Sequence, residues 1–187
     1  MKKMSAKRVA LLVLAVLMAV VAVGSTVAYL VDKTPPVKNT FTPVAVSCEV
    51  QEDFDEVANT KQNVSVKNTG DVAAYIRVAL VVTWVKDEGG TTYGGAPVSG
   101  TDYTLVLAEN GWVRGADGFY YCKTAIAAGD TTPTLVQAIA PVAGRAPEDY
   151  HLSVQIISSA IQADPARAVT SAWRGVTVNP DGTITPQ

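Results

Sequence analysis

An apolar side chain at every second position from residue 74 to residue 84, within the run of residues 72–85, constrains this chain more than any other feature of it. A period of two residues is the signature of a half-buried β-strand, and the β-branched content of the run favours a strand over a helix. A slip of one residue would turn the whole apolar set to the opposite face, so the register of this strand must be tightly specified. The residues that would share the buried face are Ala74, Ile76, Val78, Leu80, Val82 and Trp84.

A shorter strand and a turn signal come directly before this run. In residues 63–68 the side chains of Val64 and Val66 share one face. Thr69-Gly70-Asp71 follows, and a sequence of this kind is typical of a tight turn. We therefore predict that residues 63–68 and 72–85 form an antiparallel hairpin with a long second arm.

Short alternating segments with Gly or Pro between them fill most of the remaining chain. Residues 51–60 are predicted to form an acidic loop between two of these segments. Many short strands with regular turn signals are typical of a β-sandwich. The sequence thus predicts an all-β domain over residues 44–187, a jelly-roll-like β-sandwich with one short helix. The further strands are predicted at residues 44–50, 103–107, 112–113, 119–123, 134–139, 151–160, 176–178 and 183–185.

The short helix is predicted directly after Asp164. An aspartate can cap a helix N-terminus, and Pro165 suits the first helical position. Gly175 can end the helix, because glycine adopts the left-handed conformation common at that point. The buried stripe of this helix would consist of Val169, Ala172 and Trp173.

The N-terminal segment has the organisation of an export signal. Four basic residues within the first eight precede an unbroken apolar run over residues 9–23 and small residues at 24–28. This pattern predicts a signal peptide, a signal helix over residues 1–28, with cleavage between Ala28 and Tyr29. The alternative is an uncleaved anchor, because about 20 apolar residues suffice to span a bilayer. Either reading directs the rest of the chain to the outside of the cell, as a secreted or surface protein.

Length and charge limit the size of the mature domain and the classes of partner it can bind. The chain has 187 residues, and removal of residues 1–28 leaves 159, enough for one domain with a real core. Four of the 15 basic residues lie in the signal, so 11 basic residues face 17 acidic ones and the mature net charge is −6. This balance argues against nucleic acid as a partner and against an anionic membrane surface, so membrane contact is expected only through the signal segment.

Two cysteines, Cys48 and Cys122, lie in strand-like segments. An even cysteine count in an exported protein is consistent with a disulfide between them. The alternative is two buried free thiols, since unpaired cysteine behaves as a small apolar residue.

The residues offer little chemistry, and we assign no catalytic, metal-binding or cofactor-binding residue. The one histidine, His151, falls on the outer face of a predicted strand, away from the buried setting that a serine-type triad requires. Zinc sites need three or four His, Cys, Asp or Glu ligands, which this inventory does not supply at close spacing. The acidic cluster at residues 49–56 lacks the alternating ligand loop of a calcium site, and a solvated loop explains it better. Three aromatic residues remain as weak candidates for an exposed sugar platform, with packing as the default: Tyr93, Trp112 and Tyr120.

Several segments resemble one family of exported proteins. The signal is followed by Ser25-Thr-Val-Ala-Tyr-Leu-Val-Asp32 and Lys38-Asn-Thr-Phe41, which is similar to the exit of proteins processed by a dedicated signal peptidase of the SipW type. The resemblance is to the TasA and camelysin matrix proteins of Gram-positive bacteria, and it spans nearly the whole chain. It is also carried by Val64-Ser-Val-Lys-Asn-Thr-Gly-Asp71, Ala74-Tyr-Ile-Arg-Val78, Tyr120-Tyr-Cys-Lys123, Gly129-Asp-Thr-Thr132 and Ser159-Ala-Ile-Gln-Ala163.

The resemblance implies a jelly-roll domain, secretion after cleavage and assembly into extracellular fibres, in which the N-terminal arm of one subunit adds a strand to the next. Residues 29–43 suit such an arm, because an extended apolar segment can pair with an open sheet edge. Pro35 and Pro36 cannot donate a ladder hydrogen bond, so the usable donor strand is confined to residues 29–34 or 37–41. The apolar residues of the candidate arm are Tyr29, Leu30, Val31, Val37 and Phe41.

The function expected from the sequence is that of a secreted structural protein of the cell surface or biofilm matrix. Its expected partners are further copies of itself or a related fibre subunit, and the signal peptidase during export. Two alternatives stay open. One is a camelysin-like secreted metalloprotease, which the resemblance alone suggests, and the other is an N-terminally tethered surface module that binds a ligand.

Overall fold

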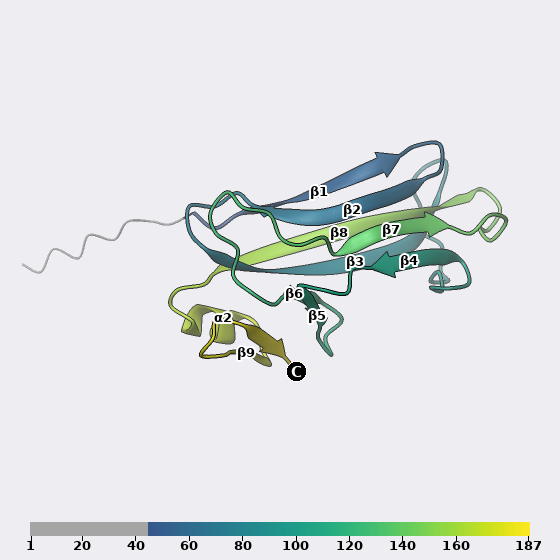
Figure 1. Ribbon diagram of the computed structural model, residues 1–187. Coiled ribbons are helices and arrows are strands. Elements are labelled where there is room, and N and C mark those ends of the chain that lie inside the picture. The colour runs from purple at the N-terminus through teal and green to yellow at the C-terminus, as the bar shows by residue number, and fades with distance from the viewer. Residues whose placement is uncertain (1–44) are drawn as a thin grey trace, which may run out of the picture. The chain divides into compact units, whose positions relative to one another are not determined.

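The structure, a computed structural model, describes residues 45–187 (Figure 1). The predicted signal segment, its cleavage position between Ala28 and Tyr29, and the arm of residues 29–43 lie outside the described residues. Among residues 45–187, no helix is both long enough and apolar enough to cross a bilayer.

Two four-stranded antiparallel sheets pack face to face, so the predicted β-sandwich is confirmed at this level. The first sheet has the order β1–β2–β7–β4, and the second has the order β5–β6–β3–β8. The strands of the first sheet are β1 (Cys48–Asp55), β2 (Thr60–Asn68), β7 (Val136–Pro141) and β4 (Tyr103–Leu107). Those of the second are β5 (Trp112–Arg114), β6 (Tyr120–Cys122), β3 (Ala74–Lys86) and β8 (Tyr150–Gln162).

The main core lies between the two sheets and is built from the alternating faces that the sequence predicts. Val64 and Val66 of β2 and Ile76 and Val78 of β3 are completely buried there. Each fully buried side chain of this size contributes about 1.5–3 kcal/mol to folding relative to an exposed one. Burial of this face fixes the register of β3, which pairs with β8 without interruption from Ala74↔Gln162 to Lys86↔Tyr150.

The predicted hairpin of residues 63–68 with residues 72–85 is wrong. β2 pairs with β1 and β7, whereas β3 belongs to the opposite sheet, where it pairs with β6 and β8. The connection between β2 and β3 is therefore a crossing between the layers. Asn68 anchors this crossing, because its buried Nδ2 donates to the carbonyls of Val72 (2.8 Å) and Ile126 (2.9 Å). Gly70 is required there by close approach, since a Cβ would meet the carbonyl oxygen of Ala45 at 2.6 Å.

The acidic loop predicted over residues 51–60 is also wrong for most of its length. β1 continues to Asp55, and only the four residues that follow form the turn into β2. Asp55 organises that turn, because its carboxylate accepts hydrogen bonds from the N–H groups of Val57 and Ala58, both at 3.0 Å. β1 is an edge strand whose last five residues are exposed, so hydration tolerates acidic side chains that a central strand would exclude.

The C-terminal residues form a cap on the outer face of the second sheet. We define the C-terminal cap as α2 (Arg167–Ala172) with the hairpin of β9 (Val176–Val178) and β10 (Ile184–Pro186). It builds a second apolar cluster in which Val169, Trp173 and Ile184 pack with Tyr75 and Tyr121. Tyr75 and Tyr121 point away from the main core, and the C-terminal cap explains why they are nevertheless buried.

The predicted helix exists but begins and packs differently. Its N-cap is Ala166, with no side-chain cap, so the predicted capping role of Asp164 is wrong. Val169 and Trp173 are buried as predicted, one helical turn apart, whereas Ala172 is exposed. A helix of six residues presents one narrow buried face, and Ala172 lies outside it. Gly175, the predicted terminator, lies two residues beyond the C-cap Trp173. Its φ of +76° belongs to the turn in which the N–H of Val176 donates to the carbonyl of Trp173.

Candidate functional site at the open edge of strand β8

The longest open edge among the described residues belongs to β8. This strand has 13 residues, lies at the end of the second sheet and pairs with β3 alone. The N–H and C=O groups on its other side have no ladder partner within residues 45–187. An edge of this kind is a template for pairing with another chain.

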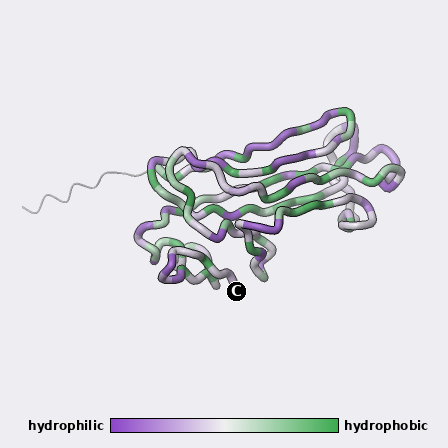
Figure 2. Tube along the Cα trace, viewed as in Figure 1, coloured by the Kyte–Doolittle hydropathy of each residue, from purple (hydrophilic) through white to green (hydrophobic). Residues whose placement is uncertain are grey.

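β8 lacks the features by which proteins usually block such edges. Its sequence, YHLSVQIISSAIQ, contains no Lys, Arg, Asp, Glu or Pro, and its pairing with β3 has no bulge. The other sheet edges are protected. β1 carries four carboxylates and a register shift between Gln51 and Asp53, β4 has a shift between Val106 and Leu107, and β5 has only three residues. Figure 2 shows β1 as a largely hydrophilic strand. β8 is therefore the edge most open to a further strand.

The sandwich is also open on its core side at this edge. Val154 and Ile156 of β8 face the main core yet are only half-buried, and so are Cys48 and Val50 of β1 across from them. One side-chain bond bridges the two strands, from Cys48 Sγ to Ser158 Oγ at 3.3 Å. We call this strip of half-buried apolar side chains between the two edge strands the β1–β8 margin.

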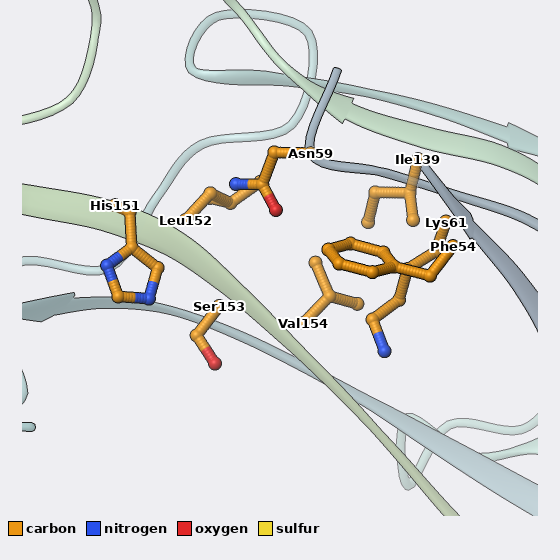
Figure 3. Close-up of a pocket in the computed structure, with 8 residues that line it drawn as sticks. All are labelled: Phe54, Asn59, Lys61, Ile139, His151, Leu152, Ser153 and Val154. Atoms are coloured by element: carbon orange, nitrogen blue, oxygen red, sulfur yellow. The ribbon is translucent and has the colours of Figure 1, made fainter. Parts of the chain in front are cut away.

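A hollow of about 230 Å³ continues the β1–β8 margin toward the start of β8 (Figure 3). Its apolar side is formed by Ile139, Leu152 and Val154, and the ring of Phe54 lies over it with half of its surface exposed. Lys61 lies beside that ring, 5.7 Å from Nζ to the ring centroid, and is ion-paired with Glu52. The residues that line the hollow are Phe54, Asn59, Lys61, Ile139, His151, Leu152, Ser153 and Val154.

His151 lies on the outer face of β8 and is exposed, as predicted. Its Nδ1 is 2.7 Å from Oδ1 of Asp87, and both side chains are well hydrated. Ser153 makes no hydrogen bond with His151 among the described contacts, so His151 and Asp87 form a hydrogen-bonded pair and not a nucleophile–base–acid relay. The arrangement fastens the start of β8 to the end of β3.

The two cysteines occupy different sheets, Cys48 at the start of β1 and Cys122 at the end of β6. Both are free thiols in the structure, and a disulfide between them stays a prediction. Cys122 is completely buried in the main core, and this burial raises the pKa of its thiol.

Two of the three aromatic candidates for a sugar platform are core residues. Trp112 and Tyr120 are buried in the main core, and the indole N–H of Trp112 donates to the carbonyl of Pro133 at 2.9 Å. Packing, the default interpretation from the sequence, is therefore confirmed for both residues. Alternation in three-residue strands is too short to predict by itself which face a residue occupies. Tyr93 is exposed and packs edge-on against Tyr150, with ring centroids 5.2 Å apart.

The acidic cluster of residues 49–56 is used in local contacts. Glu52 pairs with Lys61, Asp53 accepts from Nδ2 of Asn63 at 2.9 Å, and Asp55 holds the β1–β2 turn. Within residues 45–187, no three His, Cys, Asp or Glu side chains converge on a metal-sized site.

Sequence reasoning missed the open edge of β8, although a signal for it was present. An uninterrupted run of 13 residues without a charged side chain or proline is unusual in a strand that ends a sheet. That absence became informative only once the pairing placed β8 at the end of the second sheet.

Comparison with known proteins adds no relative: no protein-family model, no curated protein and no solved structure matches this chain.

Proposed function

We propose that this protein is a secreted structural subunit of the cell surface or biofilm matrix that assembles by strand donation. In this mechanism residues 29–43 of one subunit pair with the open edge of β8 in the next. The single observation that carries the proposal is that edge, 13 residues long and free of charge, proline and bulge, beside the half-buried β1–β8 margin. An added strand would satisfy the backbone groups of β8 and cover the margin with alternate side chains.

The strand order supports an acceptor position beside β8. In a regular jelly roll, whose eight strands form two Greek keys, the first strand lies beside the last and the fourth beside the fifth. The neighbours β2–β7–β4 and β8–β3–β6 of this chain follow that order, but β1 pairs with β2 and β5 pairs with β6. We infer a jelly-roll-like sandwich in which the place of the first strand, beside β8, is open to a strand from another subunit.

The sequence of the arm suits this acceptor. Residues 29–34 and 37–41 are the two stretches free of proline, and each is short enough to pair within the length of β8. The arm contains Asp32, Lys33 and Lys38, a net charge of +1, whereas the mature chain as a whole is acidic. Because each subunit would donate to the next and accept from the previous one, the contact is head-to-tail and yields filaments unless a ring closes.

The same proposal includes the steps before assembly. A dedicated signal peptidase would cleave between Ala28 and Tyr29, and no nucleic acid or cofactor takes part. Retention of uncleaved residues 1–28 in a membrane fraction would instead favour the N-terminally tethered surface module. Mass spectrometry of the N-terminus of the exported protein distinguishes cleavage from tethering.

The decisive experiment compares the mature chain, residues 29–187, with a chain lacking residues 29–41. We expect filaments by negative-stain microscopy for the first and none for the second, because the described residues belong to a compact unit with its own core and keep their fold without the arm. Filaments that persist without the arm would contradict strand donation.

The acceptor is tested separately with Val154→Lys, which places a charge in the β1–β8 margin, the device by which natural edges prevent pairing. The matched control is Val98→Lys, at a loop position 57% exposed. We expect only Val154→Lys to abolish filaments. Binding of a labelled peptide of residues 29–41 to the armless chain gives a readout that does not depend on filaments. Failure of this peptide to bind the armless chain would overturn β8 as the acceptor.

A further inference from the structure

Three pairs of residues place a short side-chain carbonyl directly before a glycine: Asn110-Gly111, Asp117-Gly118 and Asp181-Gly182. At such a pair the backbone nitrogen of the glycine can attack the side-chain carbonyl carbon and close a five-membered succinimide ring. Glycine favours this step because it has no Cβ to obstruct the approach. Asparagine is the more labile of the two side chains, and it counts among the thermolabile residues of proteins. The fold decides which pair reacts, through the bonds that hold the nitrogen and the carbonyl.

The fold restrains both aspartate pairs. In each pair the glycine N–H donates to a backbone carbonyl, at 3.1 Å for Gly118 and at 3.0 Å for Gly182. In each pair the carboxylate also accepts a hydrogen bond, from a hydroxyl at 2.6 Å for Asp117 and from an N–H at 2.9 Å for Asp181. Ring closure would have to break both bonds first. The partners of these four groups are, in the same order, Gly115, Asn179, Tyr121 and Thr183.

The asparagine pair has neither restraint. The side chain of Asn110 is exposed and takes part in none of the hydrogen bonds formed within residues 45–187. The N–H of Gly111 likewise donates to no group in that part of the chain. Asn110 also lines a separate hollow of about 430 Å³ beside β4, which leaves room for the ring and for water. The attacking nitrogen and the carbonyl that it attacks are therefore both free.

The fold itself requires glycine after Asn110. Gly111 has a φ of +86°, a left-handed conformation that residues with a Cβ rarely adopt. A Cβ at this position would also lie 2.7 Å from Cγ of Pro133. The carbonyl of Gly111 accepts from the N–H of Lys123 at 2.9 Å, directly before Trp112 enters the main core. Packing thus imposes the reactive neighbour on Asn110.

We propose that Asn110 is a site of spontaneous deamidation in the folded protein. The nitrogen of Gly111 bonds to Cγ of Asn110 and the bond from Cγ to Nδ2 breaks, so that Nδ2 leaves as ammonia with the proton of the Gly111 N–H. Water then opens the succinimide at either carbonyl carbon, which gives aspartate or isoaspartate. Either product is ionised at neutral pH and adds one negative charge. This inference goes beyond the proposed function, because it uses neither the arm nor the edge of β8.

The position of Asn110 determines what the product changes. Residues 108–111 join β4 of the first sheet to β5 of the second, and backbone hydrogen bonds hold this connection at Ala108 and Gly111. Isoaspartate adds one methylene to the main chain between these two anchors. Glu109 and Asn110 are exposed there, so the longer main chain can bow outward into water. The modified protein therefore keeps its fold and accumulates with age as a more acidic form.

The test incubates the mature chain, residues 29–187, in mildly alkaline buffer and maps its peptides by mass spectrometry over time. We expect aspartate and isoaspartate at position 110, with an acidic shift of one charge in isoelectric focusing. Asn110→Gln should abolish this shift, because the longer side chain would have to close a six-membered ring. Asn59 and Asn63 are controls within the same chain and should stay intact, since each precedes a β-branched residue that obstructs ring closure.

Urea at concentrations below the unfolding transition shows which state reacts. The unfolded fraction rises steeply with urea, because the free energy of unfolding falls linearly with its concentration. A reaction of the folded protein should keep its rate in this range. A rate that rises in step with the unfolded fraction would overturn the inference. So would an Asn110 that stays intact in the folded protein and converts only after full denaturation.

Discussion

At the scale of single residues, Asn68 does most to hold the two layers in place. Its side chain is completely buried, and its Nδ2 lies within hydrogen-bond distance of the carbonyls of Val72, Ile126 and Ala127. Its Oδ1 accepts from the N–H of Gly70 at 3.0 Å. One amide therefore satisfies backbone groups of the β2–β3 crossing and of the segment after β6.

Replacing Asn68 with Ala should lower the free energy of unfolding by about 2–4 kcal/mol, because it leaves several buried backbone groups without partners. Denaturant unfolding followed by circular dichroism measures this change. Asn110→Ala, an exposed position, serves as the control and should stay within about 0.5 kcal/mol of the parent. A loss below about 1 kcal/mol for Asn68→Ala would show that water replaces the amide.

At the scale of elements, the alternation predicted which segments are strands but not which strands are neighbours. The face of β3 was correct, and the limits of β4 were exact to the residue. The hairpin of β2 with β3 was wrong, because period two determines the direction of side chains and carries no information about the sheet that a strand joins. Asn68 and Gly70 look like ordinary turn residues in the sequence, and only the packing reveals them as the anchor of a crossing.

The C-terminal cap is held to the second sheet by an aromatic stack around Arg77. The guanidinium carbon lies 4.2 Å from the ring centroid of Phe119 and 4.9 Å from that of Trp173. Trp173 also meets Tyr121 edge-on, with ring centroids 5.6 Å apart. Arg77 lies on the face of β3 opposite the predicted apolar set, and its stacking could not be predicted from a local pattern that ends before the C-terminal cap begins.

Trp173→Ala should destabilise the protein by about 3–5 kcal/mol, since it removes a large side chain from the centre of the second apolar cluster. Hydrogen exchange should accelerate first in β9 and β10, which depend on this cluster for burial. Arg174→Ala changes the next, exposed residue and should have little effect on either measurement. Unchanged exchange in β9 and β10 after loss of Trp173 would contradict this account of the C-terminal cap.

At the scale of the whole molecule, three buried side chains that can lose a proton make the free energy of unfolding depend on pH in the alkaline range. They are the thiol of Cys122 and the hydroxyls of Tyr75 and Tyr121. Burial is the main cause that raises the pKa of Cys122 above its ordinary value of 9.0, and of Tyr75 and Tyr121 above 10.0. The charge of Asp181 adds to the effect on Tyr75, and the hydrogen bond to Asp117 adds to that on Tyr121. The folded state thus holds these protons more tightly than the unfolded chain does.

The free energy of unfolding should therefore be highest below about pH 9 and fall as the pH rises through the raised pKa values. Ionisation of Tyr75 would also remove the hydrogen bond that its hydroxyl donates to the carbonyl of Gly182 at 2.7 Å. Denaturant unfolding of the parent and of Tyr75→Phe at pH values from neutral to strongly alkaline measures the effect. The variant should lose stability less steeply, and identical slopes would mean that Tyr75 does not contribute.

The limits of sequence reasoning at this scale come from contacts between distant segments. The sandwich and most of its strands follow from local periodicity, and so does the buried pair Val169 and Trp173. The candidate site does not, because an edge exists only after every pairing is known: β8 became an edge when β1 paired with β2 instead. The burial of Trp112 and Tyr120 was likewise decided by strands remote in the sequence.

The long ladder between β3 and β8 has a consequence for how fast the chain can fold. It joins Ala74 to Gln162, residues 88 positions apart, so the second sheet cannot close until nearly the whole domain has been synthesised. Closing so large a loop costs entropy before any contact repays it, and domains dominated by such pairings fold in about milliseconds to seconds. During that interval both long strands have free edges, and the nascent chain is exposed to aggregation or to capture by a chaperone. Of the two strands, β8 is completed last, and it is also the one whose second edge has no ladder partner among residues 45–187.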